Sequence, residues 1–143
     1  MNLDDLLQEW SIDSEINPLE PSKELIKIPK LHSKYLTILS NNKLSLKNIE
    51  FKYNKMKKIK WEYYNGKLDD ETLAKYGWQP FPFVLKTDLN MYLDADQDLN
   101  KLLAQKYIYQ EIVDSCHSIL KELNNRAWEL KSYIDWEKFI QGN

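Results

Sequence analysis

The stretch DADQDLNKLLAQKYIYQEIVDSCHSILKELNNRAWELKSYI, residues 94–134, is the most informative about the architecture because its apolar residues recur three and four positions apart. This spacing is that of a heptad repeat and predicts a long helix from Asp94 to at least Ala127. One seam of this helix contains a single lysine and is made of Leu99, Leu102, Lys106, Tyr109, Val113, Cys116, Leu120, Leu123, Ala127, Leu130 and Ile134. Three isoleucines widen the stripe: Ile108, Ile112 and Ile119. A stripe this wide suits packing against several helices, either of the same chain or of neighbouring subunits.

If neighbouring subunits supply the packing, the seam is an oligomerisation surface. Its candidate residues are Leu99, Leu102, Tyr109, Val113, Cys116, Leu120 and Leu123. Cys116 occupies a seam position, where a buried small apolar residue is its expected role.

A second predicted helix covers residues 43–64 and ends at the left-handed stop Asn65-Gly66. At ~100° per residue, one stripe of this helix is apolar and consists of Leu46, Ile49, Tyr53, Met56, Ile59 and Tyr63. Most of its lysines fall on the other side, together with Phe51 and Trp61. Because lysines follow phosphates and aromatic rings stack on unpaired bases, this composition is typical of a sequence-neutral site for single-stranded nucleic acid. The candidate DNA-binding residues are Lys43, Lys47, Lys55, Lys57, Lys58, Lys60, Phe51 and Trp61.

Two simpler interpretations of this helix stay open. The lysines could only solubilise a helix surface, and Phe51 and Trp61 could cover another part of the core. Ideal helical geometry also places Lys52 and Lys60 within or beside the apolar stripe. These two lysines must therefore extend past apolar neighbours or lie where the helix bends.

The charge of the chain is strongly segregated, although the net charge is only −2. Residues 1–20 carry six acids and no base, residues 21–67 carry twelve lysines and three glutamates, and the remainder is acidic. Such an asymmetry indicates an anionic partner for the middle segment.

Capping residues and prolines predict the elements of the N-terminal half. Asn2 is the expected N-cap of a short helix that reaches Trp10, and residues 12–21 are a linker. A helix from Ser22 is expected to bend or restart at Pro29, and residues 40–42 (Ser-Asn-Asn) suggest a break before the basic helix.

The segment before the long helix is less regular. Residues 69–76 predict a short helix that ends at Gly77, and the prolines of residues 78–83 require an extended chain. Residues 80–93 either pair as short strands or cross the surface, so the fold class is mainly α with short strands as an open alternative.

Composition excludes several classes of protein. The three glycines cannot form a glycine-rich phosphate-binding loop. A single cysteine permits no disulfide within the chain and suits a reducing cytoplasm. The longest run without a charge, residues 76–85, is too short to span a bilayer.

No cluster of side chains predicts catalysis, a metal ion or a cofactor. The run DADQD at residues 94–98 resembles the opening of a calcium loop, but Leu99 stands where the glycine belongs and Gln105 where the bidentate glutamate belongs. Acids that cap a helix N-terminus explain the run better. The two histidines, His32 and His117, lie far apart in the sequence, so the chain is not expected to be an enzyme.

An ordered set of segments resembles the UvsY family of recombination mediator proteins from T4-like bacteriophages. The set consists of LDDLLQEW (3–10) with Asp13 and Ile16, HSKYL (32–36), KIKWEYYNG (58–66) and LDADQDL (93–99). The resemblance implies a protein without enzymatic activity that acts in the cytoplasm of an infected bacterium. It implies binding to single-stranded DNA and to a RecA-like phage recombinase, which replaces the phage single-strand-binding protein on DNA.

The resemblance also implies a ring of about six or seven subunits, assembled through the C-terminal region. It transfers the family's DNA-binding basic pair onto Lys58 and Lys60, where two lysines replace a lysine and an arginine. The charge is kept, but the planar fork of arginine is lost. Residues 1–93 are thus the expected DNA-binding region and residues 94–143 the expected oligomerisation region. The alternative is a helical scaffold protein whose basic helix binds an acidic protein.

Overall fold

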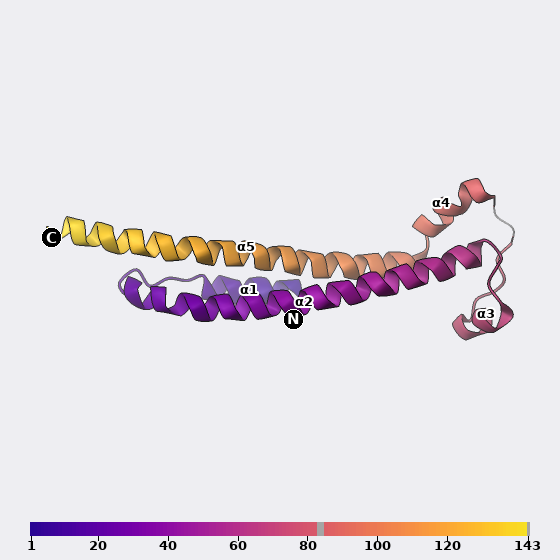
Figure 1. The fold of residues 1–143 in the computed structure, drawn as a ribbon, viewed down its shortest axis with the longest axis horizontal. Coiled ribbons are helices and arrows are strands. Elements are labelled where there is room, and N and C mark those ends of the chain that lie inside the picture. The colour runs from indigo at the N-terminus through magenta and orange to yellow at the C-terminus, as the bar shows by residue number, and fades with distance from the viewer. Residues whose placement is uncertain (83–84, 143) are drawn as a thin grey trace. The chain divides into compact units, whose positions relative to one another are not determined.

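The computed structural model describes residues 1–82 and 85–142. The elements in chain order are α1 (Leu3–Asp13), α2 (Pro21–Tyr64), α3 (Asp70–Tyr76), the 3-10 turn η1 (Lys86–Asp88), α4 (Leu89–Asp94) and α5 (Gln97–Ile140), as Figure 1 shows. The mainly α fold and the long C-terminal helix are confirmed. Among the described residues of 80–93 the structure has η1 and α4 instead of strands, and residues 83–84 lie outside the described part.

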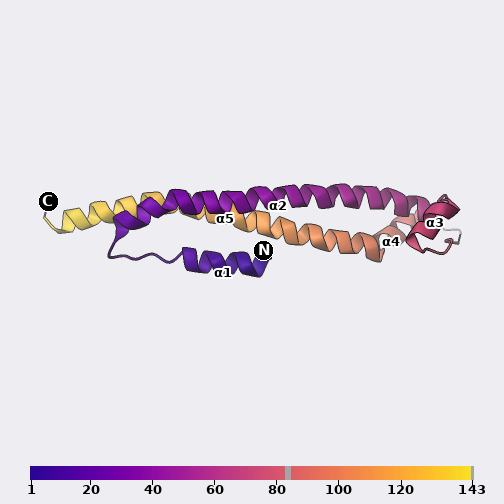
Figure 2. The same cartoon turned by 90° about the horizontal axis from the view of Figure 1, so that it is seen from below.

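The chain forms two compact units, each of which contains part of α2 and part of α5. The first unit comprises Met1–Leu44 and Ile108–Asn143, and the second comprises Ser45–Tyr107. This division follows packing and differs from the functional division expected at residues 93 and 94. Within each unit the segments of α2 and α5 run antiparallel (Figures 1 and 2).

The core of the first unit is built from α1, α2 and α5. Its buried residues are Leu6, Tyr35, Leu39, Ile112, Val113, Cys116, Ile119 and Leu123. The stripe of α5 therefore packs here on helices of its own chain, and burial raises the pKa of the Cys116 thiol. Of the described helices, none is long and apolar enough to cross a membrane.

The acidic N-terminal helix α1 covers this core. Asn2 caps it as predicted, because the Asn2 side chain accepts from the backbone of Asp5 while the Asp5 carboxylate accepts from the backbone of Asn2. Leu6 is fully buried, and the Trp10 ring meets Tyr35 edge-on at 5.5 Å between centroids. Leu6 and Trp10 of α1 thus pack within their own chain.

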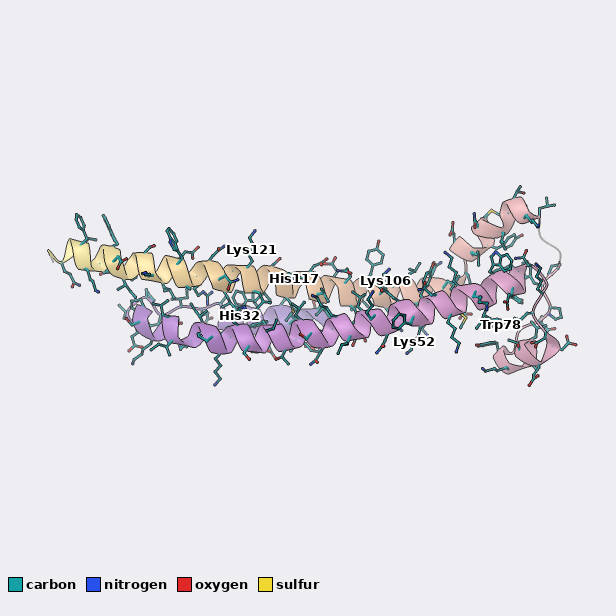
Figure 3. The ribbon with its side chains drawn as sticks, in the orientation of Figure 1. His32, Lys52, Trp78, Lys106, His117 and Lys121 are labelled. Atoms are coloured by element: carbon teal, nitrogen blue, oxygen red, sulfur yellow. The ribbon has the colours of Figure 1, made fainter. Side chains whose placement is uncertain are left out.

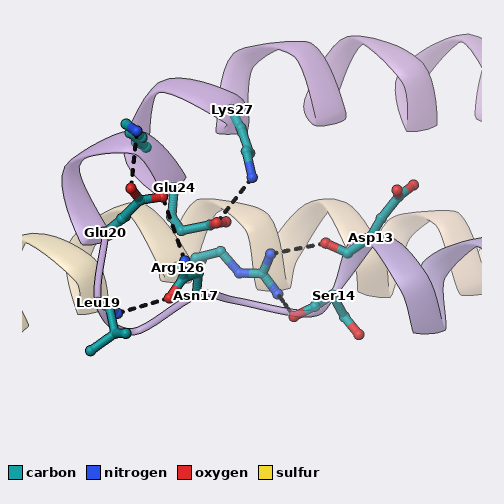
Figure 4. Close-up of polar contacts among 9 residues, drawn as sticks. Asp13, Ser14, Asn17, Leu19, Glu20, Glu24, Lys27 and Arg126 are labelled. Atoms are coloured by element: carbon teal, nitrogen blue, oxygen red, sulfur yellow. Dashed lines mark hydrogen bonds and ion pairs between the residues drawn. The ribbon is translucent and has the colours of Figure 1, made fainter.

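Arg126 of α5 holds the end of α1 and the start of the linker. Its buried guanidinium donates to the carbonyl oxygens of Asp13 at 3.4 Å and Ser14 at 3.0 Å, as Figure 4 shows. These carbonyls belong to the last turn of α1 and lack partners within that helix. Nearby, Glu24 is buried and pairs with Lys27 at 3.0 Å, which lowers the pKa of the Glu24 carboxyl.

The predicted break at residues 40–42 is wrong, because α2 continues through them and through Pro29. Tyr35 and Leu39, one turn apart, both point into the core and hold this part of the helix in place. Asn42 stays helical and donates from its side chain to the carbonyl of Ile38 at 2.8 Å. Packing of the buried face therefore outweighs the weak helix propensity of the Ser-Asn-Asn sequence.

In the second unit, the short helix α3 follows its sequence signals. The Asp69 side chain caps its first turn by accepting from the backbone of Thr72 at 2.9 Å. Gly77 ends it with a φ of +68°, a left-handed conformation that favours glycine. The reversal brings the Trp78 ring onto the Tyr76 ring, with centroids 4.5 Å apart and planes nearly parallel.

Candidate nucleic-acid interface

The second half of α2 carries an exposed lysine surface. The apolar stripe predicted for residues 46–63 is buried or half-buried at all six positions. In the second unit four predicted lysines are exposed: Lys47, Lys55, Lys57 and Lys58. Lys43 is likewise exposed in the first unit, and Lys52 also points to solvent (Figure 3).

These lysines are largely uncompensated by acids. Lys47 pairs with Glu50 at 3.2 Å. Within residues 1–82 and 85–142, no salt bridge involves Lys55, Lys57 or Lys58. Ammonium groups exposed in this way are available to phosphate oxygens.

Two aromatic side chains lie exposed on the same segment. Phe51 is 66% exposed and Trp61 is 43% exposed, so neither serves to cover the core. Lys67 adds a cation that sequence reasoning missed: its ammonium lies 5.2 Å from the centroid of the Trp61 ring. The signal was Gly66, whose left-handed turn reverses the chain so that the Lys67 backbone donates to the Glu62 carbonyl at 2.9 Å. An aromatic ring beside a cation can stack on a base while the cation meets the neighbouring phosphate.

Lys58 and Lys60, which correspond to the family's basic pair, lie in different environments. Lys58 is exposed, whereas Lys60 is only 5% exposed. The Lys60 ammonium lies 3.0 Å from one oxygen of Asp96 and 2.7 Å from one oxygen of Asp98. It also lies 4.0 Å from the centroid of the Trp78 ring, which packs beside the last turns of α2 (Figure 3).

Asp96 connects α2 with the first turn of α5. Its carboxylate accepts from the hydroxyl of Tyr64 at 2.5 Å and from the backbone of Leu99 at 3.0 Å. Burial by itself raises the pKa of the Asp96 carboxyl, but the hydrogen bonds from Tyr64, Leu99 and Lys60 outweigh it, and the pKa lies below its ordinary value of 3.8. We call Lys60, Tyr64, Trp78, Asp96 and Asp98 the Lys60 cluster.

The helix-capping interpretation of the run at 94–98 is therefore confirmed for Asp96. In the described part of the chain, no group of three or more acidic, histidine or cysteine residues is placed to hold a metal ion.

The seam residues of α5 are mostly covered by their own chain. Four are buried, namely Leu99, Val113, Cys116 and Leu123, and Leu102, Tyr109 and Leu120 are half-buried. The exposed apolar side chains of α5 lie elsewhere and include Trp128, Trp136, Phe139 and Ile140 near its C-terminal end. The last turns of α5 extend past the start of α2 (Figures 1 and 2).

The fold and the exposed surface define a mainly helical protein whose middle segment presents cations and aromatic rings together, as proteins that bind single strands do. The chain belongs to the UvsY family: residues 9–143 match the family model for the recombination, repair and ssDNA binding protein UvsY. The family is thus one of DNA-binding proteins.

Solved structures agree with this assignment. The crystal structure of the bacteriophage T4 recombination mediator protein UvsY in lattice type II is similar, with a TM-score of 0.87 and 25% identity over 99% of each chain. The lattice type I structure of that protein has a TM-score of 0.83 and 24% identity, over 94% of this chain and 98% of that one. No curated protein sequence matches the chain.

Proposed function

We propose that this protein is a recombination mediator that binds single-stranded DNA through the lysine surface of α2. In this role it helps a RecA-like phage recombinase to replace the single-strand-binding protein on DNA. The observation that carries the proposal is the exposure of Lys55, Lys57 and Lys58 together with Phe51 and Trp61 on one helical segment.

The chemistry of this surface suits binding without sequence preference. Lysine is a flexible point charge that follows phosphates of any sequence. Every base has a π-face, and stacking on an aromatic ring contributes roughly 1–3 kcal/mol per base. Trp61 beside Lys67 and the more exposed Phe51 are the two stacking positions we assign.

Self-assembly would raise the affinity of the protein for single-stranded DNA. Several copies of the lysine surface on one strand act at high effective concentration, so weak contacts per subunit add up to tight binding. Because most seam residues of α5 are covered within the chain, we assign the assembly surface to the exposed apolar end of α5, including Trp136 and Phe139. A strand held along such an assembly would have a fixed path, which would favour the recombinase over the single-strand-binding protein.

The scaffold alternative has less support. It requires an acidic protein on the lysine surface, and the acidic N-terminal segment of a neighbouring subunit would be one such partner. However, α1 packs on the core of its own chain. There Glu9 and Asp13 pair with Lys34 of the same chain at 2.9 and 2.7 Å.

The direct test is a fluorescence titration of a labelled single-stranded oligonucleotide at several salt concentrations. We expect the variant Lys47→Ala/Lys55→Ala/Lys58→Ala to bind more weakly, with a log–log salt slope flatter by about 0.7 for each phosphate that is no longer neutralised. The charge-matched control is Lys86→Ala/Lys121→Ala/Lys131→Ala, which removes three exposed lysines outside this surface.

Equal affinity and slope for the two triple variants would contradict the assignment of the surface.

The mediator role is tested by recombinase filament assembly on DNA precoated with single-strand-binding protein. The parent protein should accelerate this assembly, and the α2 triple variant should not. A parent protein that fails to bind single-stranded DNA at low salt would refute the proposed function.

A further inference from the structure

Lys60 differs in kind from the other lysines of α2. An ammonium group has three donors and no acceptor. The Asp96 and Asp98 carboxylates lie within 3.0 Å of the Lys60 ammonium, and the Trp78 ring covers it at 4.0 Å. With these neighbours and a side chain that is only 7% exposed, the Lys60 ammonium is poorly placed to contact a phosphate.

We propose that Lys60 is a positioning residue of the single-strand interface and does not itself bind phosphate. This inference rests on the proposed function, because its readout is binding to single-stranded DNA. Lys60 holds Asp96 and Trp78 against the last turns of α2 and thereby fixes the exposed Lys58 and Trp61 in one arrangement.

The Lys60 cluster joins three parts of the second unit. Asp96 accepts from Tyr64 in the last turn of α2 and from Leu99 in the first turn of α5. The Trp78 ring, from the chain after α3, also lies 5.1 Å from the Tyr63 ring. The C-terminal turn of α2 is thus held by side chains far along the sequence as well as by its own backbone.

Removal of the Lys60 ammonium would release this turn. It would leave the Asp96 carboxylate buried without its cation, which is strongly unfavourable. The last carbonyls of a helix lack partners within the helix, so this end would open locally first. Lys58 and Trp61 would then have to be ordered when the strand binds, at a cost in affinity.

The test compares Lys60→Met with Lys58→Ala in the full chain, using the same salt titration. We expect Lys58→Ala to flatten the log–log slope by about 0.7, because one phosphate is no longer neutralised. We expect Lys60→Met to lower the affinity at every salt concentration and to leave the slope unchanged. Circular dichroism at the titration temperature verifies that each variant is helical.

Asp96→Asn gives a second, independent test. Asparagine still caps α5 through its carbonyl oxygen, but its amide would direct a donor at Lys60 and Tyr64. Because the substitution removes a negative charge, a purely electrostatic effect would raise the affinity for DNA, whereas loss of positioning lowers it. Asp94→Asn is the charge-matched control: Asp94 is exposed and lies outside the Lys60 cluster, and we expect this substitution not to lower the affinity.

Two results would overturn the inference while the proposed function stands. One is a slope for Lys60→Met that flattens as much as that of Lys58→Ala, which would mean that Lys60 binds a phosphate directly. The other is unchanged affinity for both Lys60→Met and Asp96→Asn, which would make the cluster purely structural. If Lys60→Met does not fold, Asp96→Asn and the double variant Lys60→Met/Asp96→Asn test the inference instead. A lowered affinity for single-stranded DNA supports the inference, and an unchanged affinity contradicts it. Absence of binding by the parent protein refutes the proposed function itself and the inference with it.

Discussion

Asp13 shows at the residue scale how local partners set a charge state. Its carboxylate accepts from the Lys34 ammonium and from the Tyr35 hydroxyl, each at 2.7 Å. Burial by itself raises the pKa of the Asp13 carboxyl, but these hydrogen bonds and the charge of Lys34 outweigh it, and the pKa lies below its ordinary value of 3.8. The folded protein thus favours the charged carboxylate more than the unfolded chain does. This stabilisation is present above that ordinary value and is lost as the pH falls through the lower pKa of the folded state.

We therefore expect Asp13→Asn to lower the free energy of unfolding at neutral pH by about 1.5 kcal/mol. The value is at the low end for hydrogen bonds to charged groups, because Lys34 is partly accessible to solvent. The difference from the parent protein should shrink as the pH falls below 3.8. Denaturant unfolding at neutral and at acid pH measures both quantities. A difference that is the same at every pH would show that the charge of Asp13 contributes nothing.

At the scale of the element, the continuity of α2 can be tested at residues 40–42. Asn41 is exposed and lies inside the helix. Proline at this position removes a backbone hydrogen bond and clashes with the preceding turn, so Asn41→Pro should lower the free energy of unfolding by about 3 kcal/mol. Asn41→Ala is the matched control and should be neutral or stabilising by about 0.5 kcal/mol. Denaturant unfolding of both variants measures these free energies. If the helix were broken at residues 40–42, Asn41→Pro would not lower the free energy of unfolding.

Elements with local signals were predictable from the sequence. Asn2 and Asp69 cap their helices, and Gly77 ends α3, because each acts through backbone groups within a few residues of itself. The stripe and the lysines of the basic helix follow from helical periodicity alone. What could not be predicted depends on distant partners.

The Lys60 cluster is the clearest case of such dependence. Ideal geometry placed Lys60 beside the apolar stripe, but only the fold brings Asp96 to it, 36 positions further along the chain. The continuity of α2 depends in the same way on the core beneath Tyr35 and Leu39. Arg126, whose partners are backbone carbonyls near the other end of the sequence, left no pattern in the sequence at all.

At the scale of the whole molecule, α5 buries one set of apolar side chains and exposes another. The middle of the helix packs in the core of its own chain through Ile112, Cys116 and Leu123. Its C-terminal end instead exposes large apolar side chains, with Trp136 58% and Phe139 70% exposed and their rings stacked 5.7 Å apart. An exposed aromatic cluster of this kind typically marks a surface for protein association. The seam thus stabilises the chain, whereas the exposed apolar side chains at the C-terminal end lie outside the seam and are free to contact another protein.

We expect Trp136→Ser/Phe139→Ser to shift the protein towards monomers in light scattering, because it removes apolar surface without touching the core. Its affinity for a long single strand should fall by up to about 10²–10⁴-fold, the range that linked binding sites provide. Affinity for an oligonucleotide that spans one subunit should stay unchanged, since the lysine surface is intact. The matched control is Leu19→Ser/Ile26→Ser, which removes a side chain that is 88% exposed in the linker before α2 and one that is 78% exposed near the start of α2. If the protein still assembles with Trp136→Ser/Phe139→Ser but not with Leu19→Ser/Ile26→Ser, the end of α5 is not the assembly surface. The interface would then lie in the linker and the first turns of α2.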